Sequence, residues 1–211
     1  MLLLEKHLEP FEHVIWDWNG TLLSDVDFAV QTVNLSLEKR NLPLIDRQTY
    51  QEKFCFPIKS YYQKLGLPTK DDEFEKLCHE FVDNFMAGIL NCPLNPGALD
   101  ILTAVKQKNK LQSILSASDQ ENLNKMVDAY KIKHLLDHVY GIKDKFAASK
   151  VYRGHQLVEA SQIDKTKTVL IGDTDHDLEV GQDLGISVIL VAHGHQNKER
   201  LCKLHDLVLE F

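Results

Sequence analysis

Short apolar runs rich in Val and Ile recur along the chain, and stretches with helical spacing of apolar positions lie between them. Apolar runs of this length are typical of parallel strands that are covered on both faces of a sheet. They predict strands at 13–16, 111–115, 138–142, 168–172, 187–191 and 207–211. The helical patterns predict helices at 97–109, 119–130, 150–161, 177–184 and 197–204. This alternation favours an α/β fold with a doubly wound, mostly parallel sheet.

The long stretch between the first two predicted strands departs from this alternation, because it contains no convincing strand. Residues 69–90 form its clearest helical pattern, with Thr69 as the expected N-cap and three acidic residues at the positive end of the helix dipole. One continuous apolar face, which predicts a packing surface, consists of Phe74, Leu77, Cys78, Phe81, Val82, Phe85, Met86 and Ile89. A second helix is expected from Ser24 to about Arg40.

Segment 91–97 contains two prolines and a glycine, which is typical of a linker that returns to a core. We therefore expect an α/β catalytic core of residues 1–22 and 96–211. An all-helical cap subdomain, residues 23–95, is expected to be inserted directly after the first strand.

The composition narrows the class of protein. Of the 211 residues, 44% are hydrophobic and 26% are charged, as in ordinary globular proteins. The net charge of −7 and the lack of a basic cluster argue against nucleic-acid binding. The apolar opening is too short for a signal peptide, and no stretch has the length of a membrane span. We therefore expect a cytoplasmic protein with no nucleic-acid or membrane partner, whose oligomeric state the sequence leaves open.

The four cysteines are scattered, and no CxxC pair occurs among Cys55, Cys78, Cys92 and Cys202. The sequence therefore predicts neither a zinc site nor a disulfide framework.

Polar side chains, with small residues between them, stand at the carboxyl ends of several predicted strands, where open α/β sheets bind their ligands. The residues concerned are Asp17, Asn19, Gly20 and Thr21 after the first strand, Ser116, Ala117 and Ser118 after the second, Lys150 at the helix after the third, and Asp173 and Asp177 after the fourth. We expect these groups to converge on one edge of the sheet.

Four of these segments resemble, in their order and spacing, the motifs of the haloacid-dehalogenase-like hydrolase superfamily. They are "DWNGT" (17–21), "SILS" (113–116), Lys150 and "GDTDHD" (172–177). The helical insert is similar to the type 1 cap of that family. The segments "FCFPIKSYYQKLG" (54–66) and "GDTDHDLEVGQDLG" (172–185) are similar to its phosphoglycolate-phosphatase-like branch. The resemblance covers nearly the whole chain and implies a Rossmann-like core that hydrolyses a small phosphorylated metabolite.

The resemblance implies that Asp17 attacks phosphorus and forms an aspartyl-phosphate, which splits one difficult displacement into two. It implies Mg²⁺ as the cofactor, since a hard cation with oxygen ligands screens the attack of one anion on another. Asp17, Asp173 and the backbone carbonyl of Asn19 would be ligands, and Asp177 would hold a ligand water.

For the substrate, the resemblance implies that Ser116 and the N–H of Ala117 hold the phosphoryl oxygens. Lys150 would neutralise their charge and orient Asp17. Gly20 and Thr21 would lie beside the phosphoryl group, with Thr21 hydrogen-bonded near the nucleophile. In the cap, Lys59, Tyr61 and Tyr62 are candidates for contacting the rest of the substrate, although a place on an ordinary helix surface is the simpler account.

Several of these residues have structural alternatives. Asp173 and Asp177 could cap a helix, and Asp175 could replace Asp177 at the metal. Lys150 could be a surface lysine, with Lys143 and Lys145 as rivals for its role. Three histidines, His176, His193 and His195, lack metal-ligand spacing and are expected to be solvated loop residues, although contact with substrate remains open.

Asn19 stands where phosphatases of this family normally carry an aspartate that protonates the leaving group and activates water. Acid–base help of this kind contributes about 10²–10⁴-fold in rate, and an amide cannot exchange a proton. The leading hypothesis is still a phosphate-ester hydrolase, with Asn19→Asp expected to accelerate alkyl esters most. The alternatives are a weakly active or inactive phospholigand-binding protein, or altered chemistry at a C–X or P–C bond. A receiver domain would be shorter and would have no helical insert.

Overall fold

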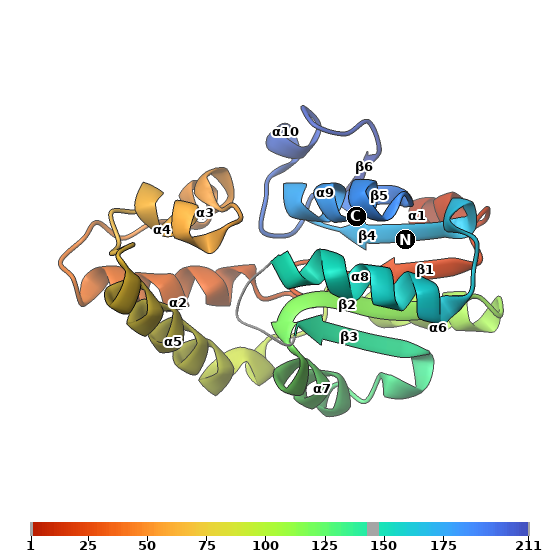
Figure 1. Ribbon diagram of the computed structural model, residues 1–211, viewed down its shortest axis with the longest axis horizontal. Coiled ribbons are helices and arrows are strands. Elements are labelled where there is room, and N and C mark those ends of the chain that lie inside the picture. Colours follow the sequence, from red (N-terminus) through yellow and green to blue (C-terminus); the bar gives the residue numbers. More distant parts are fainter. Residues whose placement is uncertain (1, 143–147, 211) are drawn as a thin grey trace.

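The predicted strands form one sheet. The computed structural model describes residues 2–142 and 148–210. The strands are β1 (His13–Trp16), β2 (Leu111–Asp119), β3 (His138–Ile142), β4 (Thr168–Gly172), β5 (Ser187–Val191) and β6 (Val208–Leu209). Their order is β3-β2-β1-β4-β5-β6, and every neighbouring pair is parallel (Figure 1). The doubly wound α/β fold is therefore confirmed, with β2 longer and β6 shorter than predicted.

Alternate residues of the strands face opposite layers of helices, which explains why the strands are apolar throughout. The helices of the core are α1 (Leu2–Leu8), α6 (Ala98–Gln107), α7 (Gln120–Ala129), α8 (Ala148–Ser161), α9 (Asp175–Leu184) and α10 (Lys198–Leu201). Trp16 and Ile171 pack in a cluster with residues of α1, α6 and α7, whereas Ile15 and Leu170 pack with residues of α8 and α9. Both faces of the sheet are thus covered, with Leu201 of α10 packed in a small cluster with residues of β5 and β6.

Four helices of the insert lie together beyond the carboxyl ends of the strands (Figure 1). They are α2 (Val26–Glu38), α3 (Arg47–Lys53), α4 (Ile58–Lys64) and α5 (Asp71–Gly88). Their side chains form a separate apolar cluster that includes Val33, Leu37, Tyr50, Phe54, Tyr61, Tyr62 and Leu77. A core of its own is the physical mark of a separate unit, so we retain the proposal that residues 23–95 form a cap.

The predicted apolar face of α5 is largely correct. Leu77 of α5 and Ile89, the residue directly after this helix, are fully buried, whereas Val82 is 45% exposed and lies outside the packing surface. The expectation that Thr69 caps this helix is wrong, because α5 begins at Asp71 and the N-cap residue, Lys70, makes no side-chain capping bond. The helices α3 and α4 were not predicted, since seven residues give barely two turns of periodicity.

The two linkers between the sheet and the insert run side by side. Ser24 N donates to Pro93 O over 2.9 Å, and Asn95 N donates to Leu22 O over 2.8 Å. Leu23 and Leu94 form an antiparallel bridge between these bonds. The proposed boundaries of the cap fall within this paired segment, which would serve as its hinge.

Two further observations concern the cysteines and the helix lengths. Cys55 and Cys92 are buried and Cys202 is exposed, and none of these three forms a disulfide. Among the described residues, no helix combines the length and the apolar character that crossing a membrane requires.

His13, at the start of β1, predicts a pH dependence of folding stability. Its side chain is buried, with Nε2 2.9 Å from Ser113 Oγ. Burial, followed by the nearby His138, lowers the pKa of His13 from 6.5 to about 4, although Asp137 opposes the shift. Between these two pH values the unfolded chain binds a proton that the folded chain does not bind. The contribution is complete above pH 6.5 and falls by about 3 kcal/mol as the pH drops through this window.

We therefore expect the wild-type protein to lose up to about 3 kcal/mol more free energy of unfolding between pH 7 and pH 4 than His13→Gln. Gln retains a polar group for Ser113 but does not titrate. Urea denaturation of both proteins at each pH measures the difference. Parallel pH profiles for the two proteins would show that His13 does not carry this dependence.

Candidate functional site

The centre of the site lies where the chain leaves β1 and β4, on either side of the point at which the strand order reverses. Trp16 pairs with Ile171, and Asp17 N donates to Ile171 O over 2.8 Å. This register brings Asp17 beside the residues that follow β4, Asp173 among them. Crevices at such reversal points are the usual ligand sites of open α/β sheets.

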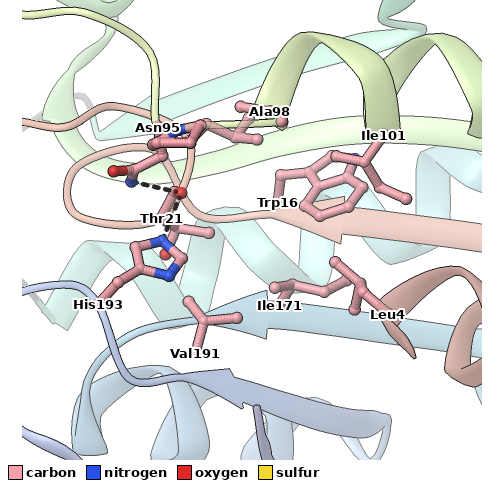
Figure 2. Close-up of a pocket in the computed structure, with 12 residues that line it drawn as sticks. Leu4, Trp16, Thr21, Asn95, Ala98, Ile101, Ile171, Val191 and His193 are labelled. Atoms are coloured by element: carbon pink, nitrogen blue, oxygen red, sulfur yellow. Dashed lines mark hydrogen bonds between the residues drawn. The ribbon is translucent and has the colours of Figure 1, made fainter. Parts of the chain in front are cut away.

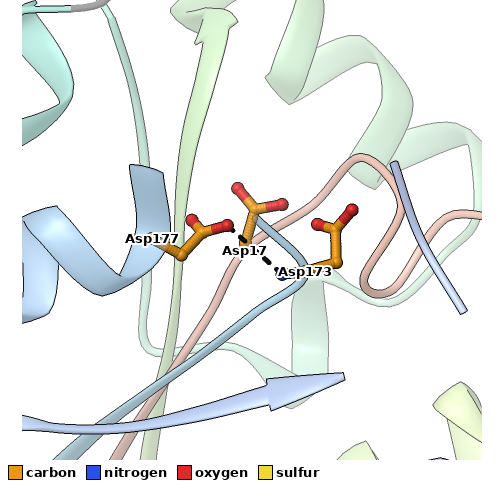
Figure 3. Close-up of side chains that lie close together, drawn as sticks. All are labelled: Asp17, Asp173 and Asp177. Atoms are coloured by element: carbon orange, nitrogen blue, oxygen red, sulfur yellow. Dashed lines mark hydrogen bonds between the residues drawn. The ribbon is translucent and has the colours of Figure 1, made fainter. Parts of the chain in front are cut away.

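Three carboxylates meet at this point. Asp17 follows β1, Asp173 follows β4, and Asp177 lies in the first turn of α9 (Figure 3). One oxygen from each lies within 4.8 Å of the others, and all three residues are buried. The structure thus brings together the three acids that the sequence analysis assigned to the metal site, Asp177 among them as the holder of a ligand water.

Lys150 connects two of these acids. Its Nζ donates to Asp17 Oδ1 over 2.5 Å and to Asp177 Oδ1 over 2.7 Å. The side chain is 3% exposed, so the alternative of a surface lysine is wrong. Burial alone would lower the pKa of Lys150, but Asp17 and Asp177 outweigh burial and raise it above its usual value. Its two rivals, Lys143 and Lys145, lie outside the described residues.

The cluster is short of positive charge. Burial raises the pKa of Asp17 to about 8 and that of Asp173 to about 6, even though Lys150 and His195, respectively, lower them. Burial also acts on Asp177, but Lys150 and Thr174 outweigh it and lower the pKa of that carboxyl. Three buried carboxylates with one lysine fit a small divalent cation, because hard cations prefer oxygen ligands and stabilise ionised carboxylates.

The sequence left open that Asp177 caps a helix, and this is correct for one of its two carboxylate oxygens, which takes part in the capping box of α9. Oδ2 accepts hydrogen bonds from Thr174 N over 3.0 Å and from Thr174 Oγ1 over 2.7 Å. Oδ1 faces Lys150 instead. Its rival Asp175 forms an ion pair of 2.5 Å with Arg200 and accepts from Gln196 over 2.7 Å. The geometry therefore favours Asp177 over Asp175 at the cluster.

The turn after β1 packs tightly against Asp173. Thr21 Oγ1 donates to Asp173 Oδ1 over 2.9 Å, so this hydrogen bond goes to Asp173 and not to Asp17. Gly20 has φ of 75°, and a Cβ at this position would lie 2.3 Å from Asp173 Oδ2. Only glycine combines this left-handed conformation with so close an approach.

The backbone of the turn is held from two sides. Thr21 O accepts hydrogen bonds from Asn95 Nδ2 over 2.9 Å and from His193 Nε2 over 3.2 Å (Figure 2). Thr21 and His193 also line a mainly apolar pocket with a volume of about 20 Å³. This pocket has room for about one water molecule, so it cannot hold a phosphorylated metabolite.

The histidines differ from the sequence expectation, because none is a solvated loop residue. His176 is buried at the start of α9, with its ring 4.7 Å from that of Phe56, and His193 is half-buried. His195 is 6% exposed, its N–H donates to Asp173 Oδ2, and its Nδ1 lies 2.9 Å from Tyr50 OH. The physical reason is that the insert covers this loop.

Helix α3 of the insert contacts the loop of residues 192–197, called the histidine loop here because it contains His193 and His195. Arg47 Nη2 donates to His193 O over 3.0 Å, and Gln51 Nε2 donates to Gly194 O over 2.7 Å. These contacts join the insert to the core next to the carboxylate cluster.

Asn19 is held by two side chains. Its Oδ1 accepts from Ser118 Oγ over 2.8 Å, and its Nδ2 donates to Asp25 Oδ2 over 2.7 Å. Asp25 is fully buried, and its Oδ1 lies 3.5 Å from His195 Nε2. Burial alone would lower the pKa of His195, but Asp25, followed by Asp173 and Asp17, raises it to about 9.

The remaining candidates lie at different distances from this centre. Ser116 is buried within β2, which continues to Asp119, and accepts from Ser118 N over 3.1 Å, while Ala117 is half-buried. In the insert, Lys59 is exposed, with its Nζ 5.5 Å from the Phe74 ring centre. Its role toward substrate stays a prediction.

Tyr61 and Tyr62 are 2% and 3% exposed and belong to the apolar cluster of the insert. Their burial favours a packing role over contact with substrate.

Sequence reasoning missed Asp25 and Tyr50, and it placed Ser118 at the sheet edge without giving it a role. An acid six residues beyond Asn19 looks like an ordinary helix start, particularly beside Ser24. The sequence did contain one signal. Ser24 and Asp25 are both good N-cap residues, and one helix needs only one of them, so the other could serve the site. Nothing in the sequence links Tyr50 to His195, because the contact spans 145 positions.

Comparison with known proteins identifies the family of this chain and agrees with its fold. A family model described as haloacid dehalogenase-like hydrolase matches residues 14–191. The N-acetylmuramic acid 6-phosphate phosphatase of Pseudomonas aeruginosa is 25% identical over 197 residues, which cover 88% of this chain and 84% of that protein. The phosphoglycolate phosphatase of Synechococcus elongatus is 18% identical over 189 residues, covering 89% and 87%.

Among solved structures, a haloacid dehalogenase-like family hydrolase from Streptococcus pneumoniae has the same fold. The two chains align with a TM-score of 0.80 at 19% identity, covering 96% of this chain and 94% of that one. The match of the family model over most of the chain is the decisive finding. The chain therefore belongs to the haloacid dehalogenase-like hydrolase family, in its phosphoglycolate-phosphatase-like branch, and is a phosphatase-like enzyme.

Proposed function

We propose that this protein is a magnesium-dependent hydrolase of a small phosphate monoester and works through an aspartyl-phosphate on Asp17. The observation that carries the proposal is the buried cluster in which Lys150 joins Asp17 to Asp177, with Asp173 close by. A buried lysine that holds one oxygen of a carboxylate orients that carboxylate for attack. The surplus of negative charge in the cluster supports a divalent cation.

In this proposal, a carboxylate oxygen of Asp17 forms a bond to phosphorus, and the bond from phosphorus to the leaving oxygen breaks with its electron pair. Ser116 Oγ and the Ala117 N–H would bind the phosphoryl oxygens, and Lys150 would balance their charge. Water then releases phosphate and restores the carboxylate. Asp17, Asp173 and the Asn19 carbonyl would hold Mg²⁺, with Asp177 acting through water. The ion would supply charge screening between the two anions.

Asn19 limits the choice of substrate. Its amide is hydrogen-bonded on both sides and cannot protonate a leaving group. We infer a preference for phosphate compounds whose leaving group departs without a proton, such as aryl or acyl phosphates. The relatives named above act on two different phosphorylated compounds, so they support the class of small phosphorylated metabolites rather than one member.

The cap would set the choice among these metabolites. Its α3 helix contacts the histidine loop beside the cluster, and closure of such a cap excludes water from the reaction. The same amide also favours one second candidate function. A protein that binds phosphorylated ligands and turns them over slowly would retain the cluster and lack the acid.

The first expected result is phosphate release from an aryl phosphate, because an aryl leaving group needs little protonation. Turnover should require Mg²⁺ and should stop when a chelator removes the ion. A continuous absorbance assay of the released phenolate measures it. If purified, folded protein releases no product with Mg²⁺ present, the hydrolase proposal fails and the phospholigand-binding function becomes the better account.

A further inference from the structure

Asp25 stands out because its side chain does not serve the helix that it begins. It is the N-cap residue of α2, yet its carboxylate makes no capping hydrogen bond. Both oxygens instead point to the turn after β1. Oδ2 accepts from Asn19 Nδ2 over 2.7 Å, and Oδ1 accepts from Gly20 N over 2.7 Å. A residue type that usually caps a helix is therefore used to hold the turn of the site.

The surroundings of Asp25 determine which way the Asn19 amide faces. Each neighbour of the buried carboxylate is a donor: the Asn19 amide, the Gly20 N–H and the His195 ring, with Nε2 3.5 Å away. Because an ionised carboxylate only accepts hydrogen bonds, the Asn19 amide must turn its nitrogen toward Asp25. The amide oxygen is left for Ser118, whose hydroxyl donates to it over 2.8 Å. Asn19 acts as a donor on one side and an acceptor on the other, which an amide can do and an ionised carboxylate cannot.

An ionised aspartate at position 19 would not fit this arrangement. Its oxygen would take the place of the Asn19 nitrogen, 2.7 Å from Asp25 Oδ2. Two buried carboxylates at that distance repel each other, and one hydrogen bond is lost. Exchanging the two residue types removes this repulsion, because an amide at position 25 can donate a hydrogen bond to a carboxylate at position 19.

We propose that Asp25 is a positioning residue that fixes the Asn19–Gly20 turn and excludes an ionised acid from position 19. This inference rests on the proposed phosphatase function, since it explains why the acid position carries an amide. It also changes the expectation for Asn19→Asp. That single substitution should not accelerate alkyl esters most; the gain should appear only when Asp25 is replaced as well.

The test is a double-mutant cycle on stability, in a chelator at pH 8, followed by activity. Asn19→Asp should raise the unfolding equilibrium constant. Adding Asp25→Asn to this variant should lower that constant again by at least about tenfold, as expected for residues in contact. Asn19→Asp with Asp25→Ser is a second double variant. Ser can cap α2 and donate to the new carboxylate at position 19 if the first combination folds poorly.

A matched control is Asn95→Asp, which makes the same chemical change in a linker residue whose side chain holds the same turn. Asn95 Nδ2 donates to backbone carbonyls of Gly20, Thr21 and Leu23, and its loss should not be recovered by Asp25→Asn. The proposal is overturned if Asn19→Asp is as stable as the wild type, if neither double variant recovers stability, or if Asn95→Asp is recovered equally.

The activity measurement tests how the rate depends on leaving-group pKa, which a purely structural role of Asp25 would not change. The doubly substituted protein should depend less steeply on leaving-group pKa across a series of aryl and alkyl phosphates, by about 10²-fold at the alkyl end. An unchanged slope overturns the link to leaving-group chemistry. A protein that shows stability coupling but no turnover of any ester refutes the proposed function and leaves the structural role of Asp25 in place.

Discussion

Replacement of Asp17 by Asn is expected to lower the turnover of an aryl phosphate by at least about 10⁴-fold, because the loss of a covalent nucleophile removes the whole two-step route. The amide cannot attack phosphorus, and Lys150 loses one of its two carboxylate partners. The side chain keeps its volume, so the protein should remain folded. Steady-state assays with saturating Mg²⁺, together with a thermal melting curve, measure both effects.

Asp175→Asn provides the matched control for this result. Asp175 begins α9, two residues after Asp173, but pairs with Arg200 and Gln196 away from the cluster. Its substitution should reduce turnover only slightly. Comparable losses in both variants would mean that a general change of charge, rather than a nucleophile, explains the effect of Asp17→Asn.

Lys150→Met is expected to have the second-largest effect, on both stability and rate. Lys150 is buried between Asp17 and Asp177, and removing one partner of a buried ion pair costs about 3–5 kcal/mol. The rate should fall by about 10²–10³-fold, since the charge that stabilises the transferring phosphoryl group is lost. Urea denaturation at pH 8 and assays with an aryl phosphate measure the two losses.

Added Mg²⁺ should restore part of the stability of Lys150→Met, because a cation among the carboxylates replaces some of the missing charge. Lys125→Met, at an exposed position of α7, is the control and should have little effect. If Lys150→Met is as stable as the wild type in the absence of metal, Lys150 does not hold the cluster together electrostatically.

The sequence predicted the core of this fold well for a physical reason. Parallel strands covered on both faces are short, wholly apolar runs, and β1, β3, β4 and β5 coincide with those runs. Register in such a sheet fixes which residues share its carboxyl edge. The meeting of Asp17 with Asp173 could therefore be predicted, and the helical spacing of four residues brought in Asp177.

The rest depended on contacts that no local pattern encodes. The short helices α3 and α4 are held by the packing of their aromatic residues, and their own periodicity is too brief to detect. His195 is buried because α3 covers its loop, although the loop itself is rich in polar residues. Asp25 looked like the start of a helix, and only its hydrogen bonds to Asn19 and Gly20 reveal its other role.

The central claim is that phosphate becomes covalently attached to Asp17. The most direct test is to mix the protein with Mg²⁺ and an aryl phosphate, quench during turnover, reduce with borohydride and analyse the peptides by mass spectrometry. Reduction converts an aspartyl-phosphate into homoserine, and we expect this product at position 17 in the wild type and nowhere in Asp17→Asn. Steady turnover with no modification at Asp17 would contradict the account.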